Sequence, residues 1–295
     1  MMDWWQALIL GIVQGLTEFL PVSSSGHLII FKNLLGVDAE GFMDFTVTVH
    51  FATVMSTLVI FRKEIWALLK GLFQIKYNDA TDYVLKIVVS IIPVAIVGLF
   101  FKDYVESLFG EGVVVVGIFL IVTALLLFLS DFFSARSKGW SRLCLRRSNK
   151  GAETSSDTSV EQGNAHRNGI SYIQAFIVGL AQSFAVAPGL SRSGTTIATG
   201  LLCGVRRDVM AQFSFLMVLV PIVGEQILSV ASALSEGVQS ALPFADLILG
   251  FAGAFIAGLV SCKAMIALVK KAKLSYFAIY CLVAAAIILF LLEAV

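Results

Sequence analysis

Residues 11–27 read GIVQGLTEFLPVSSSGH, and residues 179–196 read GLAQSFAVAPGLSRSGTT. Each stretch is an apolar run broken by a proline and followed by a cluster of serine and glycine. At one constant offset of 168 residues (179 − 11), the aligned pairs are Gly11 with Gly179, Gln14 with Gln182, Ser23 with Ser191, Ser25 with Ser193 and Gly26 with Gly194. We interpret the two stretches as one motif written twice, whose two loops meet and hold a phosphate group.

Composition indicates an integral membrane protein. Hydrophobic residues make up 58% of the chain and charged residues 14%, and the mean hydropathy is +0.90. Soluble domains carry about 25% charged residues, and several apolar runs here reach the ~20 residues that cross a bilayer. The net charge of +1 gives no electrostatic basis for binding nucleic acid.

The cysteines and the N-terminus argue against a disulfide framework, a zinc site and a cleaved secretory signal. The cysteines are far apart, so they predict neither a disulfide framework nor a zinc site; they are Cys144, Cys203, Cys262 and Cys281. The first apolar run is not typical of a cleaved secretory signal, because Asp3 rather than a basic residue precedes it and Glu18 lies within it.

The apolar runs predict an all-α polytopic membrane protein with about six full transmembrane helices. The first repeat, residues 1–131, contains a re-entrant helix–loop–helix at 4–35 and spans at 45–61, 83–101 and 113–129. Residues 132–168 are rich in Ser, Gly, Asn and charge, which predicts a flexible connector. The second repeat, residues 169–295, contains a re-entrant segment at 173–204 and spans at 209–228, 247–266 and 276–292.

The number of crossings sets the relative direction of the two re-entrant segments. Three spans separate them, so the second segment enters from the opposite face. This is an inverted-topology repeat, in which the two broken segments meet near the midplane of the membrane. Irregular backbone at that depth is tolerated only where it is buried in protein or lines a cavity.

Basic residues predict the orientation, because cytoplasmic loops carry the excess of Lys and Arg. The connector shares one face with the loops that hold most of the basic residues, among them Arg62, Lys63, Lys70, Lys76, Arg206, Arg207, Lys270, Lys271 and Lys273. The other face is mainly acidic, with Lys32 and Lys102 among its few basic residues. We predict that the connector is cytoplasmic and that both termini lie outside, on the periplasmic side.

Arg192 is the strongest candidate for binding an anion. A guanidinium stays protonated, so it needs an anionic partner at membrane depth. Its neighbours are small or carry hydroxyls, which suits a phosphate; they are Ser191, Ser193, Gly194, Thr195 and Thr196. The arm beyond Gly194 is expected to be helical and to direct backbone amides at the same anion. The alternative is an arginine paired with a buried carboxylate for packing alone.

Glu18 and Gln14 lie four residues apart, on one face of the first broken helix. The Glu18 carboxylate precedes Pro21, so we expect it to point toward the loop, where it could activate water or hold a divalent ion. The alternative, compatible with these roles, is that Glu18 is only the counter-ion of Arg192. Gln14, Ser23 and Ser25 are candidates for contacting the substrate.

Ser24 and His27 are spaced for contact on the second arm of the loop. Such a pair can act as nucleophile and general base. The histidine could equally protonate the leaving phosphate or only cap the loop. We leave His50 and Glu225 out of the predicted site, the first as a packed or cavity-lining residue and the second as reachable by water. The 23 phenylalanines face lipid or the core, or line a groove for a hydrocarbon chain.

Both motifs resemble those of a known family. The run from Gln14 to His27 resembles the family pattern (E/Q)-x-x-x-E followed by P-V-S-S-x-G-H, and Pro188 to Thr196 resembles P-G-x-S-R-S-x-x-T. The family is the bacterial undecaprenyl-diphosphate phosphatases of the bacitracin-resistance type. The similarity runs through both halves and leaves out the connector.

The resemblance implies a hydrolase that removes the terminal phosphate of undecaprenyl diphosphate and recycles the lipid carrier for cell-wall synthesis. It implies catalytic roles for Glu18, Ser24, His27 and Arg192, and a divalent cation, Mg²⁺ or Ca²⁺, with Glu18 as its ligand. It also implies a multi-pass protein of the bacterial inner membrane with a site open to the periplasm. This chain has Gln14 at the first motif position, which disfavours a general base or charged metal ligand there.

Two other functions fit part of the sequence. Inverted repeats with broken helices are typical of transporters, so the same pocket could move a phosphorylated polyprenyl lipid across the bilayer. A channel is disfavoured by the scarcity of polar residues along any one span. The expected partners are the polyprenyl diphosphate and membrane lipid, and a homodimer is compatible with the sequence.

Overall fold

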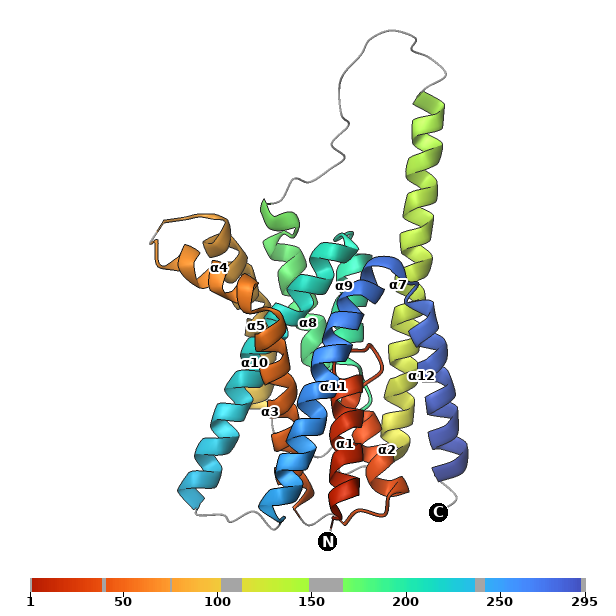
Figure 1. Ribbon diagram of the computed structural model, residues 1–295. Helices are drawn as coiled ribbons and strands as arrows, with labels where there is room; N and C mark the ends of the chain where they lie inside the picture. Colours follow the sequence, from red (N-terminus) through yellow and green to blue (C-terminus); the bar gives the residue numbers. More distant parts are fainter. Residues whose placement is uncertain are drawn as a thin grey trace.

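A computed structural model describes residues 2–38, 41–74, 76–101, 113–148, 167–236 and 242–292. Within these ranges the regular structure is helical, and no strand occurs. Most of the helices run along one common direction, and the start of the first and the end of the last lie at the same end of the molecule (Figure 1).

Helices follow one another along both predicted repeats. The first part of the chain forms α1 (Trp4–Thr17), α2 (Ser24–Leu34), α3 (Phe42–Ile60), α4 (Arg62–Leu72), α5 (Asp79–Phe100) and α7 (Val113–Ser148). A short turn, η1 (Arg167–Gly169), leads into the second part. This part forms α8 (Tyr172–Phe184), α9 (Arg192–Leu202), α10 (Arg207–Glu236), α11 (Phe244–Lys271) and α12 (Ser275–Ile287), which a π-helical turn, η2 (Ile288–Leu292), extends.

Five of the described helices are long and apolar enough to cross a membrane. They are α3, α5, the 114–133 part of α7, the 207–224 part of α10, and α11. The sixth predicted span, 276–292, corresponds to α12 and η2, whose apolar segment Ser275–Phe290 is shorter. The prediction of an all-α, multi-pass membrane protein is confirmed.

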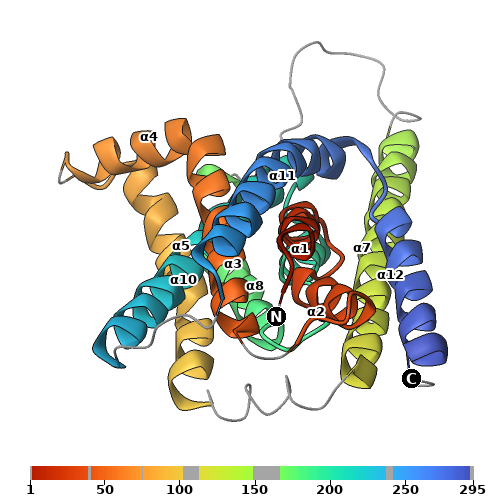
Figure 2. The same ribbon diagram turned by 60° about the horizontal axis from the view of Figure 1, so that its bottom comes forward.

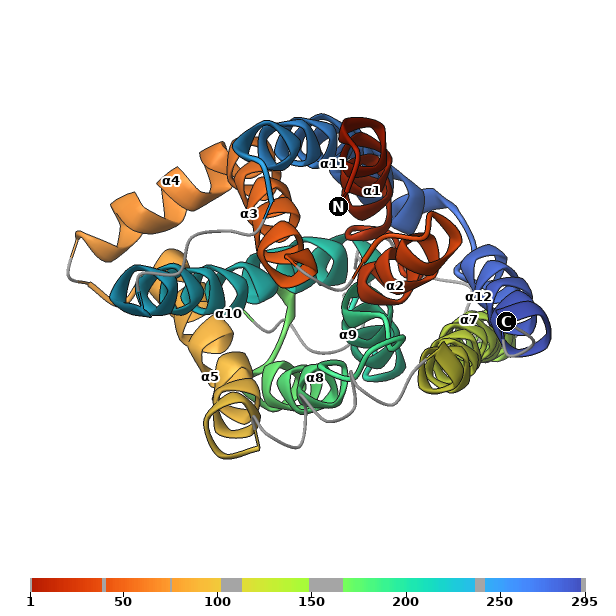
Figure 3. The same ribbon diagram turned by 90° about the horizontal axis from the view of Figure 1, so that it is seen from below.

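The two broken segments are pairs of short helices. Helix α1 has 14 residues and is therefore ~21 Å long, less than the ~30 Å thickness of the hydrocarbon core. Helices α2, α8 and α9 are shorter still. The α1–α2 pair opens toward the end of the molecule that holds the termini, and the α8–α9 pair opens toward the other end (Figure 1). Viewed from below, α2 and α9 lie near the middle of the molecule (Figure 3).

Each first arm packs closely on a span from the other half of the chain. Helix α1 lies against α11, and α8 lies against α5. A Cβ atom on Gly11 would come within 2.2 Å of the Gly250 carbonyl oxygen, and one on Gly179 within 2.0 Å of the Ser90 carbonyl oxygen. Gly11 and Gly179 are partners at the 168-residue offset, so the repeated glycine allows the same close approach in both halves.

The connector predicted at 132–168 is wrong in its first part. Helix α7 continues without a break to Ser148 and extends well beyond the other helices (Figure 1). Residues 132–148 are polar, but they contain no proline and are rich in arginine, leucine and other residues of good helix propensity. Polarity was therefore a poor guide to the end of this helix. The remaining part, 149–166, lies outside the described residues.

Helix α4 was not predicted. It directly follows α3, and none of its residues is buried. Ile65 and Leu68 pack against the core on one face, while Trp66 and Lys70 lie on the exposed remainder. Figure 2 shows α4 on one side of the molecule and the α7–α12 pair on the opposite side. Such an amphipathic helix suits the membrane surface.

Asp131 of α7 fixes the start of α12. Its carboxylate accepts hydrogen bonds from the Ser275 backbone nitrogen and hydroxyl, both at 2.8 Å. It also forms an ion pair with Arg207, whose guanidinium donates to the Ala272 carbonyl oxygen at 2.9 Å. One largely buried carboxylate thus joins α7, α10 and the turn between α11 and α12.

We expect Asp131→Ala to lower the free energy of unfolding by about 3 kcal/mol, because Arg207 would be left without its ion-pair partner and α12 would lose its cap. Thermal unfolding in detergent measures the effect. The matched control is Asp208→Ala, since Asp208 pairs with Arg206 where the side chains are 45% and 76% exposed. This change is expected to cost less than about 1 kcal/mol. Equal losses from the two variants would contradict the assignment.

Candidate active site

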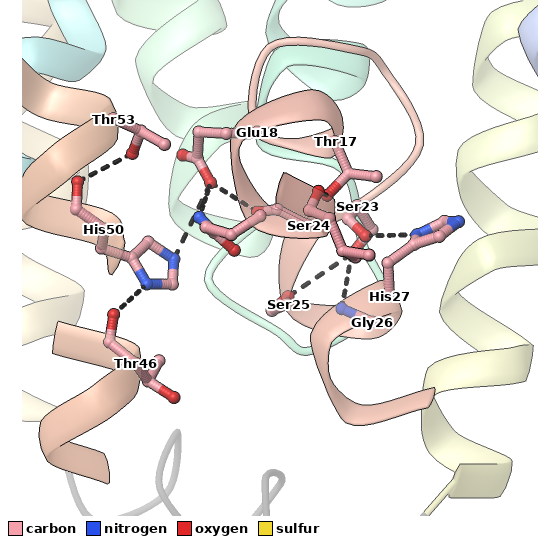
Figure 4. Close-up of polar contacts among 12 residues, drawn as sticks. Thr17, Glu18, Ser23, Ser24, Ser25, Gly26, His27, Thr46, His50 and Thr53 are labelled. Atoms are coloured by element: carbon pink, nitrogen blue, oxygen red, sulfur yellow. Dashed lines mark hydrogen bonds and ion pairs between the residues drawn. The ribbon is translucent and has the colours of Figure 1, made fainter. Parts of the chain in front are cut away.

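Glu18 lies where α1 ends, and its carboxylate contacts three side chains. Oxygen Oε2 accepts a hydrogen bond from the Gln14 side-chain amide at 2.7 Å and from the Ser24 hydroxyl at 2.5 Å. The His50 ring nitrogen Nε2 lies 3.7 Å from the same oxygen. Figure 4 shows Ser24 and His50 approaching Glu18 from opposite sides. A serine hydroxyl donating to a buried carboxylate is the arrangement of a nucleophile and its base.

Ser23 begins α2 in a strained conformation. Its φ of 67° is unusual for a residue other than glycine. The Ser23 hydroxyl caps the helix by accepting from the Gly26 backbone nitrogen at 3.4 Å, and the Ser23 carbonyl oxygen lies 2.8 Å from His27 Nδ1. The next residue is Ser24, so this strained turn determines where the Ser24 hydroxyl points.

The second loop repeats this capping arrangement. Ser191 caps α9 by accepting from the Gly194 nitrogen at 3.1 Å. The Ser191 and Ser193 hydroxyls lie 3.4 Å apart, the separation found between Ser23 and Ser25. Ser23 and Ser191 were predicted to contact the substrate. In the structure their hydroxyls cap α2 and α9.

The other predicted hydroxyls of the second loop lie close to the first repeat or to α10. Ser193 donates to the Leu20 carbonyl oxygen of the first loop at 3.1 Å, which joins the two repeats directly. The Thr196 hydroxyl lies 2.6 Å from that of Ser214 on α10.

The space around Gly194 is small. A Cβ atom on Gly194 would approach Ser191 and Pro21 within 3.1 and 3.2 Å. The buried Thr195 hydroxyl has no hydrogen-bond partner among the described residues.

Arg192 and Glu18 line one cavity. Its volume is about 30 Å³, and its walls come from the end of α1, α3, α9 and α10. In the part of the chain that the structure describes, the Arg192 guanidinium makes no hydrogen bond and no ion pair. The Glu18 carboxylate lies in the field of both His50 and Arg192. The two loops therefore bring a carboxylate and a guanidinium to one cavity, as predicted, although most of its walls are apolar side chains.

His27 does not contact Ser24, so the Ser24–His27 pair, one of the alternatives that the sequence left open, is not formed. The His27 ring is buried, with 4% of the residue exposed. Nδ1 faces the Ser23 carbonyl oxygen, and Nε2 lies 2.8 Å from the Tyr280 hydroxyl of α12. Figure 4 shows His27 directed away from Glu18. The reason is geometric: a backbone carbonyl one turn back is the nearer partner for this ring, and Ser24 is drawn to the carboxylate.

His50, which the sequence analysis left out of the predicted site, contacts Glu18. Its Nδ1 lies 2.8 Å from the Thr46 carbonyl oxygen one turn back on α3, which orients Nε2 toward Glu18. The His50 ring therefore lies beside the Glu18 carboxylate, and no ion pair between Glu18 and Arg192 occurs among the described residues. The sequence did contain a signal for His50: an ionisable residue at membrane depth favours a functional role.

Comparison with known proteins identifies the family of this chain. The model of the family described as "Bacitracin resistance protein BacA" matches residues 7–287. The undecaprenyl-diphosphatase of Bacteroides thetaiotaomicron is 51% identical over 284 residues, covering 96% of this chain and 97% of that protein. Those of Parabacteroides distasonis and Methanococcus vannielii are 50% and 35% identical, with 96% of this chain covered in each case and 96% and 98% of the relative. The chain therefore belongs to the bacitracin resistance protein BacA family.

Proposed function

We propose that this protein hydrolyses undecaprenyl diphosphate to undecaprenyl phosphate and inorganic phosphate. Membership of the family and the name shared by the relatives support this reaction. The observation that carries it is the Arg192 guanidinium, which has no hydrogen-bond or ion-pair partner among the described residues and shares a cavity with Glu18, the carboxylate that accepts from Ser24. An anion is what such a guanidinium requires, and a phosphoanhydride is what a serine with its base can attack.

Arg192 binds the terminal phosphate in this proposal. A planar guanidinium donates two parallel hydrogen bonds to phosphate oxygens, and phosphoryl transfer depends mainly on positioning and on stabilising the charge of the transferred group. The cavity of about 30 Å³ has room for water but is small for a diphosphate. Substrate binding therefore requires the lining side chains to move apart, while the polyprenyl chain stays among the apolar spans.

Ser24 is the nucleophile and Glu18 its base in the proposed reaction. Glu18 takes the hydroxyl proton as Ser24 Oγ attacks the terminal phosphorus, and the bridging oxygen leaves with undecaprenyl phosphate. Water then hydrolyses the phosphoserine, which releases inorganic phosphate and restores the hydroxyl. The 2.5 Å distance between Ser24 Oγ and Glu18 Oε2 supports this pairing over one with His27.

A divalent cation, Mg²⁺ or Ca²⁺, fits the oxygen atoms beside Ser24. The buried Gln14 Oε1 has no hydrogen-bond partner among the described residues and lies one turn from Glu18. The two side chains would hold the cation, which when bound would neutralise charge on the diphosphate. No group of three His, Cys, Asp or Glu side chains suited to a metal occurs in the described residues, so phosphate oxygens and water would complete its ligands.

The proposed location is the bacterial inner membrane, with the site open to the periplasm. Helix α4, which contains Arg62, Lys63 and Lys70, lies toward the end of the molecule opposite the termini (Figure 1). The positive-inside rule then supports a cytoplasmic position for this end and a periplasmic one for the start of α1. In this orientation the enzyme returns the carrier lipid to cell-wall synthesis and counteracts bacitracin.

The function is tested by phosphate release from undecaprenyl diphosphate by the purified protein in detergent. We expect turnover by the wild type and a loss of about 100-fold or more in kcat for Arg192→Ala, since removing one donor to a developing charge costs this much. Arg192→Lys should recover part of the loss. The control is Arg206→Ala, because Arg206 is exposed and pairs with the exposed Asp208. Full turnover by Arg192→Ala would contradict the role of Arg192.

The same assay separates hydrolysis from transport of a phosphorylated lipid. The inverted repeat favours a carrier as the second candidate. Detergent micelles have no second compartment, so phosphate release there requires cleavage. A wild-type protein that binds the lipid and releases no phosphate would favour the carrier.

A second prediction concerns the nucleophile. Acid quench within one turnover, followed by mass spectrometry, should find phosphoserine on the peptide that contains Ser24, because the attack forms a covalent intermediate. The modification should be absent from Ser24→Ala, which should also lose turnover. Direct attack by water predicts the opposite result: no modified serine at any quench time, with turnover retained in Ser24→Ala.

The orientation is tested with reporters. An alkaline phosphatase fused after Val295 should be active, because this enzyme matures outside the cytoplasm. A GFP fused at the same place should be dark, because GFP does not mature there. The same two reporters inserted between residues 150 and 165 should give the reverse signals. A fluorescent C-terminal fusion would contradict the proposed orientation.

A further inference from the structure

Helix α12 contacts the first re-entrant loop through two consecutive residues. The Tyr280 hydroxyl lies 2.8 Å from His27 Nε2, and the Cys281 thiol lies 3.5 Å from the Pro21 carbonyl oxygen. Both contacts join positions more than 250 residues apart in sequence. The last predicted span of the chain is thus held against the loop that carries Ser24.

The direction of each hydrogen bond follows from chemistry. A carbonyl oxygen can only accept, so His27 Nδ1 carries a proton and donates it to Ser23. Nε2 of the neutral ring is then an acceptor, and the Tyr280 hydroxyl donates to it. Both ring nitrogens are occupied in a residue that is 4% exposed. His27 is therefore the middle of a chain of hydrogen bonds that runs from Tyr280 to the Ser23 backbone.

The far end of that chain is the strained peptide. A serine with φ of 67° persists only where its surroundings over-determine it. The Ser23 hydroxyl accepts from the Gly26 nitrogen and lies 3.4 Å from the Ser25 hydroxyl. The Ser23 carbonyl oxygen accepts from the His27 side chain at 2.8 Å and from the His27 backbone nitrogen at 3.2 Å. This carbonyl belongs to the peptide that leads into Ser24, whose hydroxyl must stay on Glu18. Loss of the shorter, side-chain bond leaves the carbonyl oxygen with the 3.2 Å backbone bond alone, which weakens the restraint on this peptide.

The opposite loop is held in a corresponding way. Thr123 of α7 accepts a hydrogen bond from the Ser191 backbone nitrogen at 3.0 Å. Ser191 is the partner of Ser23 at the 168-residue offset, and α7 is the last helix of the first repeat as α12 is of the second. The last helix of each repeat therefore secures the capping serine in the other repeat. The hydrogen bond between Ser191 and Thr123 shares no atom with the contact between Tyr280 and His27, so it is an independent observation of the same arrangement.

We propose that Tyr280 is a positioning residue for the reaction. Through His27, its hydroxyl fixes the Ser23 peptide and so keeps Ser24 on Glu18. The proposal rests on the proposed hydrolase function. It also assigns His27 to this positioning chain and not to proton transfer with the substrate.

Tyr280→Phe tests the proposal, because it removes one oxygen atom and keeps the ring. We expect kcat to fall about 10-fold or more, since small misplacements of a reacting group have large effects on rate. KM should be unchanged, because Arg192 binds the headgroup. In a His27→Asn background the same change should have no further effect on kcat, since Tyr280 acts through His27. The matched control is Tyr276→Phe, one turn earlier on α12, where Tyr276 is 67% exposed.

A second measurement does not depend on activity. Amide hydrogen exchange over residues 20–27 should be faster in Tyr280→Phe than in the wild type, and exchange in Tyr276→Phe should match the wild type. Wild-type kcat in Tyr280→Phe, or a fall in kcat of the same size in the His27→Asn background, would overturn the proposal. So would unchanged exchange over 20–27. A wild type without phosphate release would refute the proposed function, while the exchange measurement would still test Tyr280.

Discussion

Every helix end placed at membrane depth must have its backbone groups satisfied by protein, because lipid offers no hydrogen bonds. The described part of the chain places the starts of α2 and α9 there, and each meets the constraint in the same way. Ser23 and Ser191 each accept from the backbone nitrogen three residues on. The breaks that form the site exist only because these caps make an interrupted helix tolerable within the bilayer.

The caps also explain why the two halves are so closely joined. A loop at the midplane cannot be supported by its own short arms, so it is held by the other repeat. Ser193 of the second loop donates to the Leu20 carbonyl of the first. The first arms pack on α11 and α5 through Gly11 and Gly179, where a side chain would collide with backbone. The contacts that stabilise the fold are thus the same contacts that bring the two loops of the site together.

The sequence was informative wherever the repeat constrained the structure. The common offset predicted that two loops meet, and membrane depth predicted that Glu18 and Arg192 share a chamber. The end of α7 was mispredicted, because a polar helix and a polar loop have similar compositions. The direction of His27 was left open, because spacing of three residues permits contact with Ser24 but does not exclude a backbone carbonyl or Tyr280 as nearer partners. Tyr280 lies 253 residues away from His27, and no local pattern links the two.

The repeat is symmetric in backbone and asymmetric in chemistry. At the common offset, Ser24 aligns with Arg192, and these are the first residues of α2 and α9. Glu18 aligns with Val186, and His27 with Thr195, whose buried hydroxyl has no partner among the described residues. Two equal helix starts thus present a nucleophile from one side and an anion-binding group from the other. A bound phosphate would face both, with its attacking and stabilising groups contributed by opposite halves. Substitutions that made the halves more alike would keep the scaffold and remove the reaction.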